Sequence, residues 1–389
     1  MTTEENKGSI RNRLLTGVLV IELVITVLFA TILVVSFRLN LKADAQKAVE
    51  RTRGVFDIIL KNDTNMLSAA IDSFATNDAV KQIYRDRDRE KLFGAVYELY
   101  KSNKEHHGIT QFQFIDRDGT CFLLVHRKEQ FGYTITRPTF VQARASMSSS
   151  SGIELGKTTF ALRVVSPYML SGNVLGFVEF GEGIEHFNAL VKGETGVDVA
   201  VLLDKKQLKE ADYRATRKDA GQPDDWDDLK GAVLVSTTLA DRKFVADQIS
   251  EAEVLGVSGP VFLGTTRISG RTFAKGAFPL KDSTGKQLGA VVAFSDLTEQ
   301  TGNERTALIS LLVTAFLVFG ISFYFAVRYL QAEVIDPLVD LSAQAIEISM
   351  GNVEKKLETD RDDEIGRLVR SFERMRLSLK KSLSMFAKK

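Results

Sequence analysis

Two long apolar runs constrain the fold of this 389-residue chain more than any other feature. The first extends from Leu14 to Phe37 and the second from Thr306 to Val327. Each exceeds the roughly 20 residues that a helix needs to cross the hydrocarbon core of a bilayer. The chain is therefore predicted to cross a membrane twice, with transmembrane helices at 14–37 and 306–328.

The first run is interpreted as an uncleaved anchor. Arg11 and Arg13 precede it, as in a signal peptide, but the run is too long for a signal-peptide core and no small-residue cleavage site follows. Positive charges flank this span on both sides, so the charge bias indicates orientation only weakly. Residues 1–13 are expected to form a cytoplasmic tail.

Composition excludes several classes of function. The net charge is +1, which removes any general case for nucleic-acid binding. The single cysteine, Cys121, allows no intrachain disulfide, and four histidines offer few ligands for a metal, so no metal or other cofactor is expected. His106 and His107 end an expected helix, where a cation is favourable. No nucleophile elbow, phosphate-binding loop or kinase motif is present, so an enzyme is not expected.

The segment after the second span has two narrow apolar stripes at helical spacing. The first follows Pro337 and ends before Gly351, and the second begins near Ile365. Such narrow stripes suit a coiled-coil seam better than a globular core. Two short helices of this kind are expected to bury their seams in a parallel four-helix bundle formed by a dimer. The stripes comprise Leu338, Leu341, Ala345 and Ile348, then Ile365, Leu368, Phe372, Met375 and Leu379.

Residues 329–381 resemble a HAMP domain. The motifs are Pro337 in the first helix, the connector G-x-V-x-x-x-L from Gly351, and Asp363-Glu364-Ile365-Gly366 before the second helix. The alternative is an ordinary cytoplasmic hairpin. The resemblance implies a homodimeric relay in the cytoplasm, followed by a short tail at 382–389. The residues expected to carry the signal are Pro337, Leu341, Ile348, Gly351, Glu364, Ile365 and Phe372.

Between the spans, helical periodicity gives way to that of strands. A continuation of the first membrane helix is predicted from Phe56, Leu60, Leu67, Ala70 and Phe74, with Asp63 interrupting the seam, and a second helix from about 79 to 104. Strands then follow at 109–127, with a turn at Asp118-Gly119, and in a hairpin that turns at Ser171-Gly172-Asn173. A strand near 197–206 and a strand pair at 271–296 repeat the pattern. The similar late hairpins predict an internal repeat of about 110 residues.

This external region, residues 38–305, is similar to the tandem Cache sensors, which are PAS-like ligand domains of bacterial chemoreceptors and sensor kinases. The resemblance implies an α+β fold of two antiparallel sheets behind a long N-terminal helix, with a distal half at 75–190 and a proximal half at 191–300. The chain departs from the subgroup pattern at Leu124, Lys128 and Tyr133, so its ligand is expected to differ. The matching segments are Leu123-Leu124-Val125-His126, Gly132-Tyr133, Arg137, Gly152-Ile153-Glu154-Leu155-Gly156 and Arg163-Val164-Val165-Ser166-Pro167.

Three arginines are candidates for binding an anionic ligand, because a guanidinium matches a carboxylate with two parallel hydrogen bonds. These are Arg137, Arg144 and Arg163; alternatively, Arg163 forms a salt bridge with Glu179 on the neighbouring strand. His126 is expected on the same strand face as Phe122 and Leu124, either as a hydrogen-bonding group of the pocket or as a satisfied core residue. The predicted ligand site comprises Phe122, His126, Arg137, Arg144, Arg163 and Tyr168.

An ionisable side chain, Glu22, lies inside the first span, where a charge is costly. It is expected to be protonated or to form a hydrogen bond with Ser322 or Tyr324 of the second span. The alternative is a tolerated residue near the membrane interface.

The leading hypothesis is a homodimeric transmembrane signal receptor in a bacterial plasma membrane. A small molecule bound outside would change HAMP packing and so regulate a kinase, chemotaxis or other output module that this chain does not contain, as in a two-component system. The alternative is a membrane-anchored binding protein that docks a periplasmic partner protein.

Overall fold

The computed structural model describes residues 10–156, 160–219, 221–268 and 270–386. The chain forms two compact units. The sheet unit is Leu39–Gly302, and the helical unit combines Met1–Arg38 with Asn303–Lys389.

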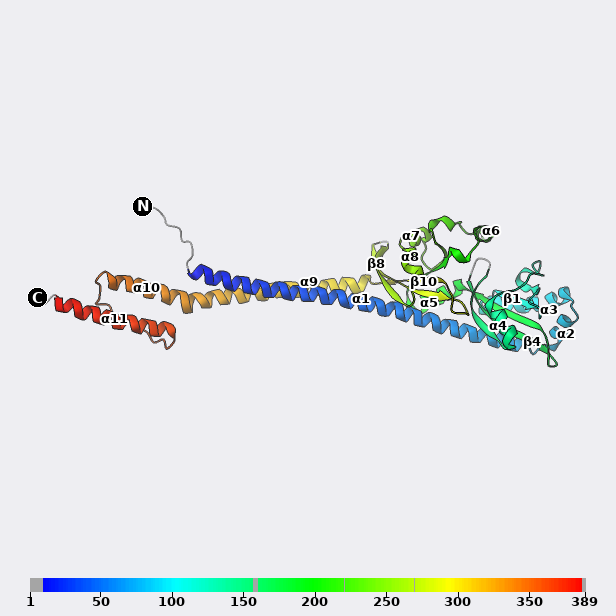
Figure 1. Ribbon diagram of the computed structural model, residues 1–389, viewed down its shortest axis with the longest axis horizontal. Coiled ribbons are helices and arrows are strands. Elements are labelled where there is room, and N and C mark those ends of the chain that lie inside the picture. Colours follow the sequence, from blue (N-terminus) through cyan, green and yellow to red (C-terminus); the bar gives the residue numbers. More distant parts are fainter. Residues whose placement is uncertain (1–9, 157–159, 220, 269, 387–389) are drawn as a thin grey trace. The chain divides into compact units, whose positions relative to one another are not determined.

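The strands of the sheet unit are drawn as arrows in Figure 1. They form two five-stranded antiparallel sheets with the same strand order. The order is β2-β1-β5-β4-β3 in the first sheet and β7-β6-β10-β9-β8 in the second. The shared order confirms the predicted internal repeat and the α+β fold. The strands of the first sheet are β1 Gln111–Ile115, β2 Cys121–Leu124, β3 Ser150–Leu155, β4 Phe160–Leu170 and β5 Asn173–Gly183. Those of the second are β6 Asp198–Asp204, β7 Ala232–Thr237, β8 Val261–Ile268, β9 Arg271–Lys281 and β10 Gln287–Asp296.

One helix, α1 (Ile10–Phe74), packs against both sheets. The Phe56 ring lies 5.7 Å from that of Phe278 on β9, and the Phe74 ring stacks at 5.7 Å on Tyr168 of β4. A single apolar core therefore runs from the second sheet to the first along one helix. The predicted helical seam is confirmed, since its members are buried or packed against this core. The buried members of α1 in this core are Val49, Phe56, Ile59, Leu67, Ile71 and Phe74.

The single helix predicted at 79–104 is wrong, because the structure has two. α2 (Asp78–Arg85) and α3 (Arg89–His107) are separated at Arg87, whose φ of 63° is left-handed. The Asp88 side chain accepts a hydrogen bond from the backbone N–H of Lys91 and so caps α3. Periodicity alone conceals such a break, since the apolar stripe continues across it.

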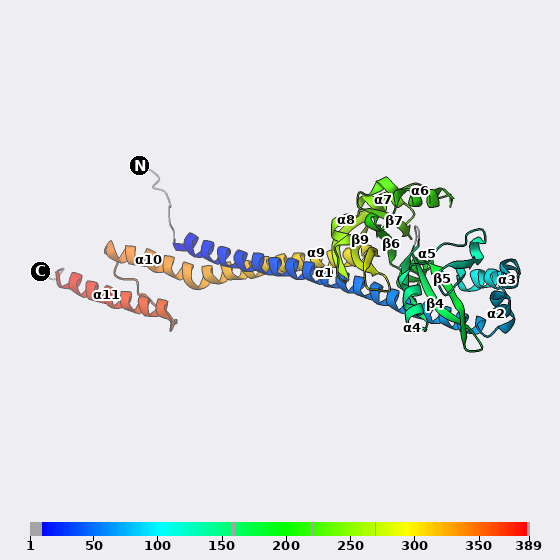
Figure 2. The ribbon, with the colours of Figure 1, turned by 45° about the vertical axis from the view of Figure 1, so that its right-hand side comes forward.

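The remaining helices of the sheet unit were not predicted. α7 (Arg242–Asp247) and α8 (Glu251–Leu255) cover the face of the second sheet that lies away from α1 (Figure 2). The others are α4 Pro138–Ser146, α5 Ile184–Thr195 and α6 Glu210–Asp219, with short turns η1 Val125–Arg127, η2 Lys205–Gln207 and η3 Trp226–Asp228.

In the helical unit, the two apolar runs lie in α1 and in α9 (Thr298–Leu330). Both helices are long and apolar enough to cross a membrane. α9 continues into η4 (Gln331–Ile335), a single π-helical turn in which the N–H of Asp336 donates to the carbonyl of Gln331. Pro337 follows, near the start of α10 (Asp336–Ser349). A proline lacks an N–H and its ring crowds the carbonyl four residues back, which explains why the regular α-helical ladder is interrupted here.

The segment after α10 folds as the sequence motifs predict. Gly351, with φ of 98°, follows the helix end, and the Asp363 carboxylate accepts the N–H of Gly366 at the start of α11 (Glu364–Phe386). The connector residues Val353 and Leu357 are buried against Ile348, with Val369 and Phe372 packed around them.

One apolar stripe of α11 stays uncovered within the chain. Leu368, Met375 and Leu379 are 40%, 50% and 40% exposed, whereas Leu341 and Ile348 of α10 are buried. The expectation that neither seam is buried within one chain therefore holds for part of α11 and fails for these α10 residues.

Gly176→Ala should destabilise the first sheet. An added Cβ would overlap the Tyr84 hydroxyl and the carbonyl of Ile115, which the same hydroxyl contacts through a 3.1 Å hydrogen bond. Overpacking of this kind costs about 1–3 kcal/mol of unfolding free energy. Denaturant unfolding of the full chain in detergent, followed by circular dichroism, measures the change.

The matched control is Gly193→Ala in α5, where nothing lies within 4 Å of the new atom. This change should be neutral or add roughly 0.5–1 kcal/mol through helix propensity. Equal stability of both variants would contradict the close approach of Tyr84 to β5.

Candidate functional site

Two arginines and two glutamates meet on the face of the first sheet that lies away from α1. Arg163 on β4 donates to Glu179 on β5 over 2.5 Å, and Arg137, the residue before α4, donates to the other oxygen of Glu179 over 2.5 Å. Glu154 on β3 lies 3.4 Å from Nε of Arg137 and 3.9 Å from Nε of Arg163. We call these four residues the ionic cluster.

The register of β4 and β5 brings Arg163 and Glu179 of the ionic cluster together. Arg163 pairs with Gly181 and Val165 with Glu179, so Arg163 and Glu179 are diagonal neighbours on one face. Their neighbours Leu162 and Val164 point to the opposite face and join the core against α1. The alternative interpretation of Arg163, a salt bridge to Glu179, is confirmed.

The ionic cluster is almost fully withdrawn from solvent. The side chains of Glu154 and Glu179 are 2% and 0% exposed, and those of Arg163 and Arg137 are 7% and 19% exposed. Burial opposes ionisation of Glu179, but Arg137 and Arg163 outweigh it and hold the pKa of Glu179 below its usual range. Burial raises the pKa of Glu154, against the hydrogen bond that it accepts from the backbone N–H of Thr139. The sheet face thus presents two guanidinium groups beside one carboxyl group whose pKa is lowered, Glu179, and one whose pKa is raised, Glu154.

The polar atoms of the ionic cluster are not all paired. Nε of Arg137, Nε of Arg163 and one oxygen of Glu154 have no hydrogen-bond partner among the described residues. The separations of 3.4 and 3.9 Å are too long for good hydrogen bonds. A buried donor without a partner costs free energy, so this cluster has unused capacity for an oxygen-bearing group.

His126 does not share a strand face with Phe122 and Leu124. The strand β2 ends at Leu124, and His126 lies in the turn η1, because the chain leaves the sheet two residues earlier than the alternation suggests. Its Nδ1 accepts the backbone N–H of Phe112 over 3.3 Å. Burial, with smaller effects from Arg127 and Arg163, lowers the pKa of His126 to about 4.

The remaining predicted pocket residues lie apart from the ionic cluster. Arg144 is exposed, donates to the carbonyl of Asp118 and lies over the Phe140 ring, so the three arginines do not converge. Phe122 faces the Arg87 guanidinium at 4.0 Å, and Tyr168 is buried against Phe74 in the core beside α1. Sequence reasoning thus placed Arg137 and Arg163 together but did not foresee the position of Glu154 beside them.

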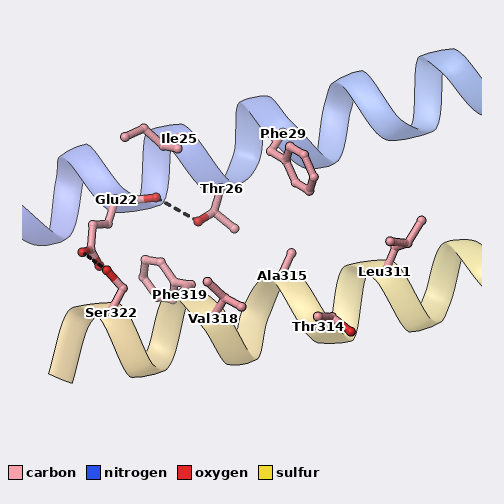
Figure 3. A pocket seen from close by; sticks show the side chains of 10 residues that line it. All are labelled: Glu22, Ile25, Thr26, Phe29, Leu311, Thr314, Ala315, Val318, Phe319 and Ser322. Carbon is pink, nitrogen blue, oxygen red and sulfur yellow. Dashed lines mark hydrogen bonds between the residues drawn. The ribbon is translucent and has the colours of Figure 1, made fainter. Parts of the chain in front are cut away.

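A second polar contact lies between the two apolar helices of the helical unit. Ser322 of α9 donates to the Glu22 carboxyl of α1 over 2.9 Å, which confirms one of the expected modes of satisfying Glu22 (Figure 3). The pair lies at one end of a groove of about 510 Å³ whose other walls are apolar. Further residues lining it are Ile25, Thr26, Phe29, Leu311, Ala315, Val318 and Phe319.

The connector of the helical unit is fixed by residues that sequence reasoning missed. Glu373 accepts the N–H of Leu357 over 3.0 Å, and Arg376, which pairs with Glu373 at 2.7 Å, donates to the carbonyl of Val353. The sequence signal for this ion pair was an arginine three residues after a glutamate in an expected helix, a spacing at which two side chains can meet. The predicted relay residues Leu341, Ile348 and Phe372 pack in this region, whereas Glu364 is exposed at the start of α11.

Comparisons with known proteins agree with this architecture. Residues 42–301 match the family model described as the double sensory domain of two-component sensor kinases, and residues 331–381 match the HAMP domain. No curated protein sequence matches the chain.

Several solved structures are similar to this chain at low sequence identity. The periplasmic domain of Vibrio cholerae LuxQ is 12% identical, with a TM-score of 0.37, over 66% of this chain and 99% of that one. The sensor domain of the V. cholerae histidine kinase DctB is 10% identical, with a TM-score of 0.38, over 66% and 97%. The ligand-binding domain of the Pseudomonas aeruginosa PAO1 amino acid chemoreceptor PctB, in complex with L-Arg, is 16% identical, with a TM-score of 0.30, over 64% and 94%.

His126→Asn should make stability less sensitive to acid. The folded-state pKa of His126, about 4, lies below the unfolded value, so the unfolded chain binds the proton first and stability falls as pH drops through this window. Asn keeps an acceptor for the Phe112 N–H but does not ionise. Melting temperatures between about pH 7.5 and 4.5 should therefore fall further for the wild type than for the variant.

The control for this experiment is His106→Asn, since His106 is exposed at the end of α3. Its acid sensitivity should equal that of the wild type. Identical pH profiles for the wild type and His126→Asn would show that His126 is not buried as described.

Proposed function

We propose that this chain, which belongs to the double Cache sensor family and is a transmembrane signal receptor, detects a small, oxygen-rich ligand. The proposed ligand site lies in the half of the sheet unit that contains the first sheet. The ionic cluster is the observation that carries the proposal. It offers two largely buried guanidinium groups with unpaired Nε–H donors beside the Glu154 carboxyl group, whose pKa burial raises.

The chemistry of the ionic cluster favours a ligand with a carboxylate or another anionic group. A carboxylate can accept the free Nε–H groups of Arg137 and Arg163 and compensate their charge more fully than Glu179 alone. Arg137 is the more accessible of the two, at 19% side-chain exposure against 7%, and is therefore the proposed first contact. His126, which accepts the backbone N–H of Phe112, stays a proposed ligand-site residue without a direct contact to the ionic cluster. Arg144, Phe122 and Tyr168 belong to the same domain but lie apart from the ionic cluster. No direct contact with this ligand is proposed for them.

Signal transfer is proposed to follow the long helices. Ligand binding in the first sheet would favour one of two packings of α1 and its neighbours, provided that the ligand binds the two packings unequally. The second membrane helix would pass the shift through η4 and Pro337 to α10, and the connector held by Glu373 would adjust against α11. The output is a separate cytoplasmic signalling protein or domain, such as a kinase or a chemotaxis component.

We further propose a homodimer in a bacterial inner membrane, with both helices crossing it, the sheet unit in the periplasm and the HAMP domain in the cytoplasm. Neither of the two matched domains is catalytic, and the chain is proposed to act by binding alone. The second candidate function is docking of a periplasmic partner protein by the sheet unit.

A screen of small organic acids, amines and amino acids should find compounds that raise the melting temperature of the full chain in detergent. Arg137→Gln should then weaken the binding of the tightest-binding acid by roughly 1.5–3 kcal/mol, about tenfold to a hundredfold in affinity, because a charged hydrogen bond is lost. Isothermal titration below the melting temperature of each variant measures this.

The control is Arg117→Gln, which changes an exposed guanidinium in the β1–β2 turn without touching the ionic cluster. Unchanged affinity in Arg137→Gln would remove the ionic cluster from ligand binding. If no small molecule binds but a periplasmic protein co-purifies with the wild type, the docking function replaces the proposal.

Met375→Cys, in a Cys121→Ala background, should crosslink two chains under mild oxidation. Met375 lies on the uncovered stripe of α11, and an apolar stripe of this length needs a partner helix. Non-reducing electrophoresis of membranes detects the covalent dimer.

Arg370→Cys is the matched control, because it lies on α11 outside the apolar stripe. Efficient crosslinking at position 370 with none at 375 would overturn the parallel bundle.

A further inference from the structure

Three potential ligand side chains meet where α1 passes the end of the first sheet. Asp63 belongs to α1, Glu182 to the end of β5, and His186 to the first turn of α5. Nε2 of His186 lies 3.1 Å from a Glu182 oxygen and 4.0 Å from an Asp63 oxygen. One ligand atom from each of the three residues lies within 4.8 Å of the others.

Glu182 is the unusual member of this group. Its side chain is fully buried, and neither carboxyl oxygen has a hydrogen-bond partner among the described residues. Asp63 has one oxygen in the same condition. Gly108, at the end of α3, approaches so closely that an added Cβ would lie 2.9 Å from Glu182 Oε1. Two carboxyl groups thus face each other with a single imidazole between them.

Such an arrangement is costly without a compensating cation. A buried carboxylate needs a hydrogen bond or an opposite charge, and a half-exposed histidine supplies only part of one. Burial, together with Asp63, raises the pKa of Glu182 to about 8. Burial also raises the pKa of Asp63, and His186 opposes this effect.

We propose that Asp63, Glu182 and His186 form a binding site for a divalent transition-metal ion, with Zn²⁺ as the matching probe. One imidazole nitrogen and two carboxylate oxygens are a ligand set that Zn²⁺ accepts, and three protein ligands leave a position for water. Ca²⁺ and Mg²⁺ fit less well, because they require more oxygen ligands and do not favour imidazole.

A route for the ion exists beside these ligands. A cavity of about 440 Å³ runs along α1 and α5, and Asp63 lies in its wall. Its other lining residues include Ile58, Asn62, Leu190 and Glu194. The His186 side chain is 42% exposed, so the open coordination position can face solvent.

The site would connect three elements that belong to different parts of the sheet unit. The long helix, the last strand of the first sheet and the helix leading to the second sheet each supply one ligand. A bound ion would therefore stabilise the packing of α1 beside both sheets, independently of any ligand at the ionic cluster.

The sequence conceals this site because Asp63 lies far from the other two ligands. Glu182 and His186 are only four residues apart, at the junction where β5 ends and α5 begins. The expectation that the chain binds no metal rested on the small number of histidines, and carboxylates supply the missing ligands here.

The test uses the purified full chain in detergent, treated with a chelator and then desalted. Titration calorimetry with ZnCl₂ should show one ion per chain, and Co²⁺ should give the visible absorption of a low-coordinate site. Zn²⁺ should raise the melting temperature, whereas Mg²⁺ and Ca²⁺ at the same concentration should not. His186→Ala should weaken Zn²⁺ binding by at least about tenfold and remove the shift.

Glu182→Gln provides a second variant that should fold. It replaces a buried carboxyl group that has no hydrogen-bond partner among the described residues with a neutral amide of similar shape. It should therefore melt near the temperature of the metal-free wild type and yet lose most of the Zn²⁺ response. The control is the double variant His106→Ala, His107→Ala, which removes the neighbouring exposed histidines and should bind Zn²⁺ as the wild type does.

Two outcomes would overturn the proposal. One is the absence of stoichiometric Zn²⁺ binding by the wild type. The other is binding that survives in His186→Ala and Glu182→Gln but disappears in the His106, His107 double variant.

Discussion

The packing of α1 against both sheets is the interaction on which the rest of the sheet unit depends. Aromatic rings at opposite ends of one helical stripe, Phe56 and Phe74, join different sheets to the same core. Each sheet needs a cover for its apolar face, and a single rigid element supplies both. A displacement of α1 at one sheet must therefore be accommodated at the other, because a close-packed core does not deform gradually.

In the ionic cluster, the ion pairs that stabilise the fold involve the same side chains that are proposed to bind a ligand. Removing either arginine would leave Glu179 with an incomplete partner in a dry environment, which is expensive. Yet the cluster retains donors without acceptors, so its pairing is not at an optimum. The unpaired donors are the feature that makes this cluster the proposed ligand site.

Much of the fold was predictable from local patterns, and the failures have physical causes. The late hairpin of the first sheet was found because two apolar runs, β4 and β5, are separated by a turn at Ser171-Gly172, two residues with positive φ. The break at Arg87 was missed because the apolar period continues through it. Helices such as α7 and α8 have only a few residues each, and their burial against the second sheet decides their conformation.

The candidate site was predictable only where strand neighbours define it. Arg163 and Glu179 could be paired from β4 and β5 alone, since the hairpin register follows from the turn. Glu154 and Arg137 come from a third strand and a loop, whose positions depend on tertiary packing. For the same reason His126 was assigned to a strand that ends before it.

The π-helical turn at Gln331–Ile335 has a consequence for the angular relation of the helices around it. A π turn holds about one residue more than an α turn, and each α-helical residue advances the azimuth by about 100°. The exposed apolar surface of α9 and the stripe that α10 buries therefore need not lie in phase along the sequence. The turn works as an angular offset, and it allows α9 and α10 to present differently oriented faces although the chain continues from one helix into the other.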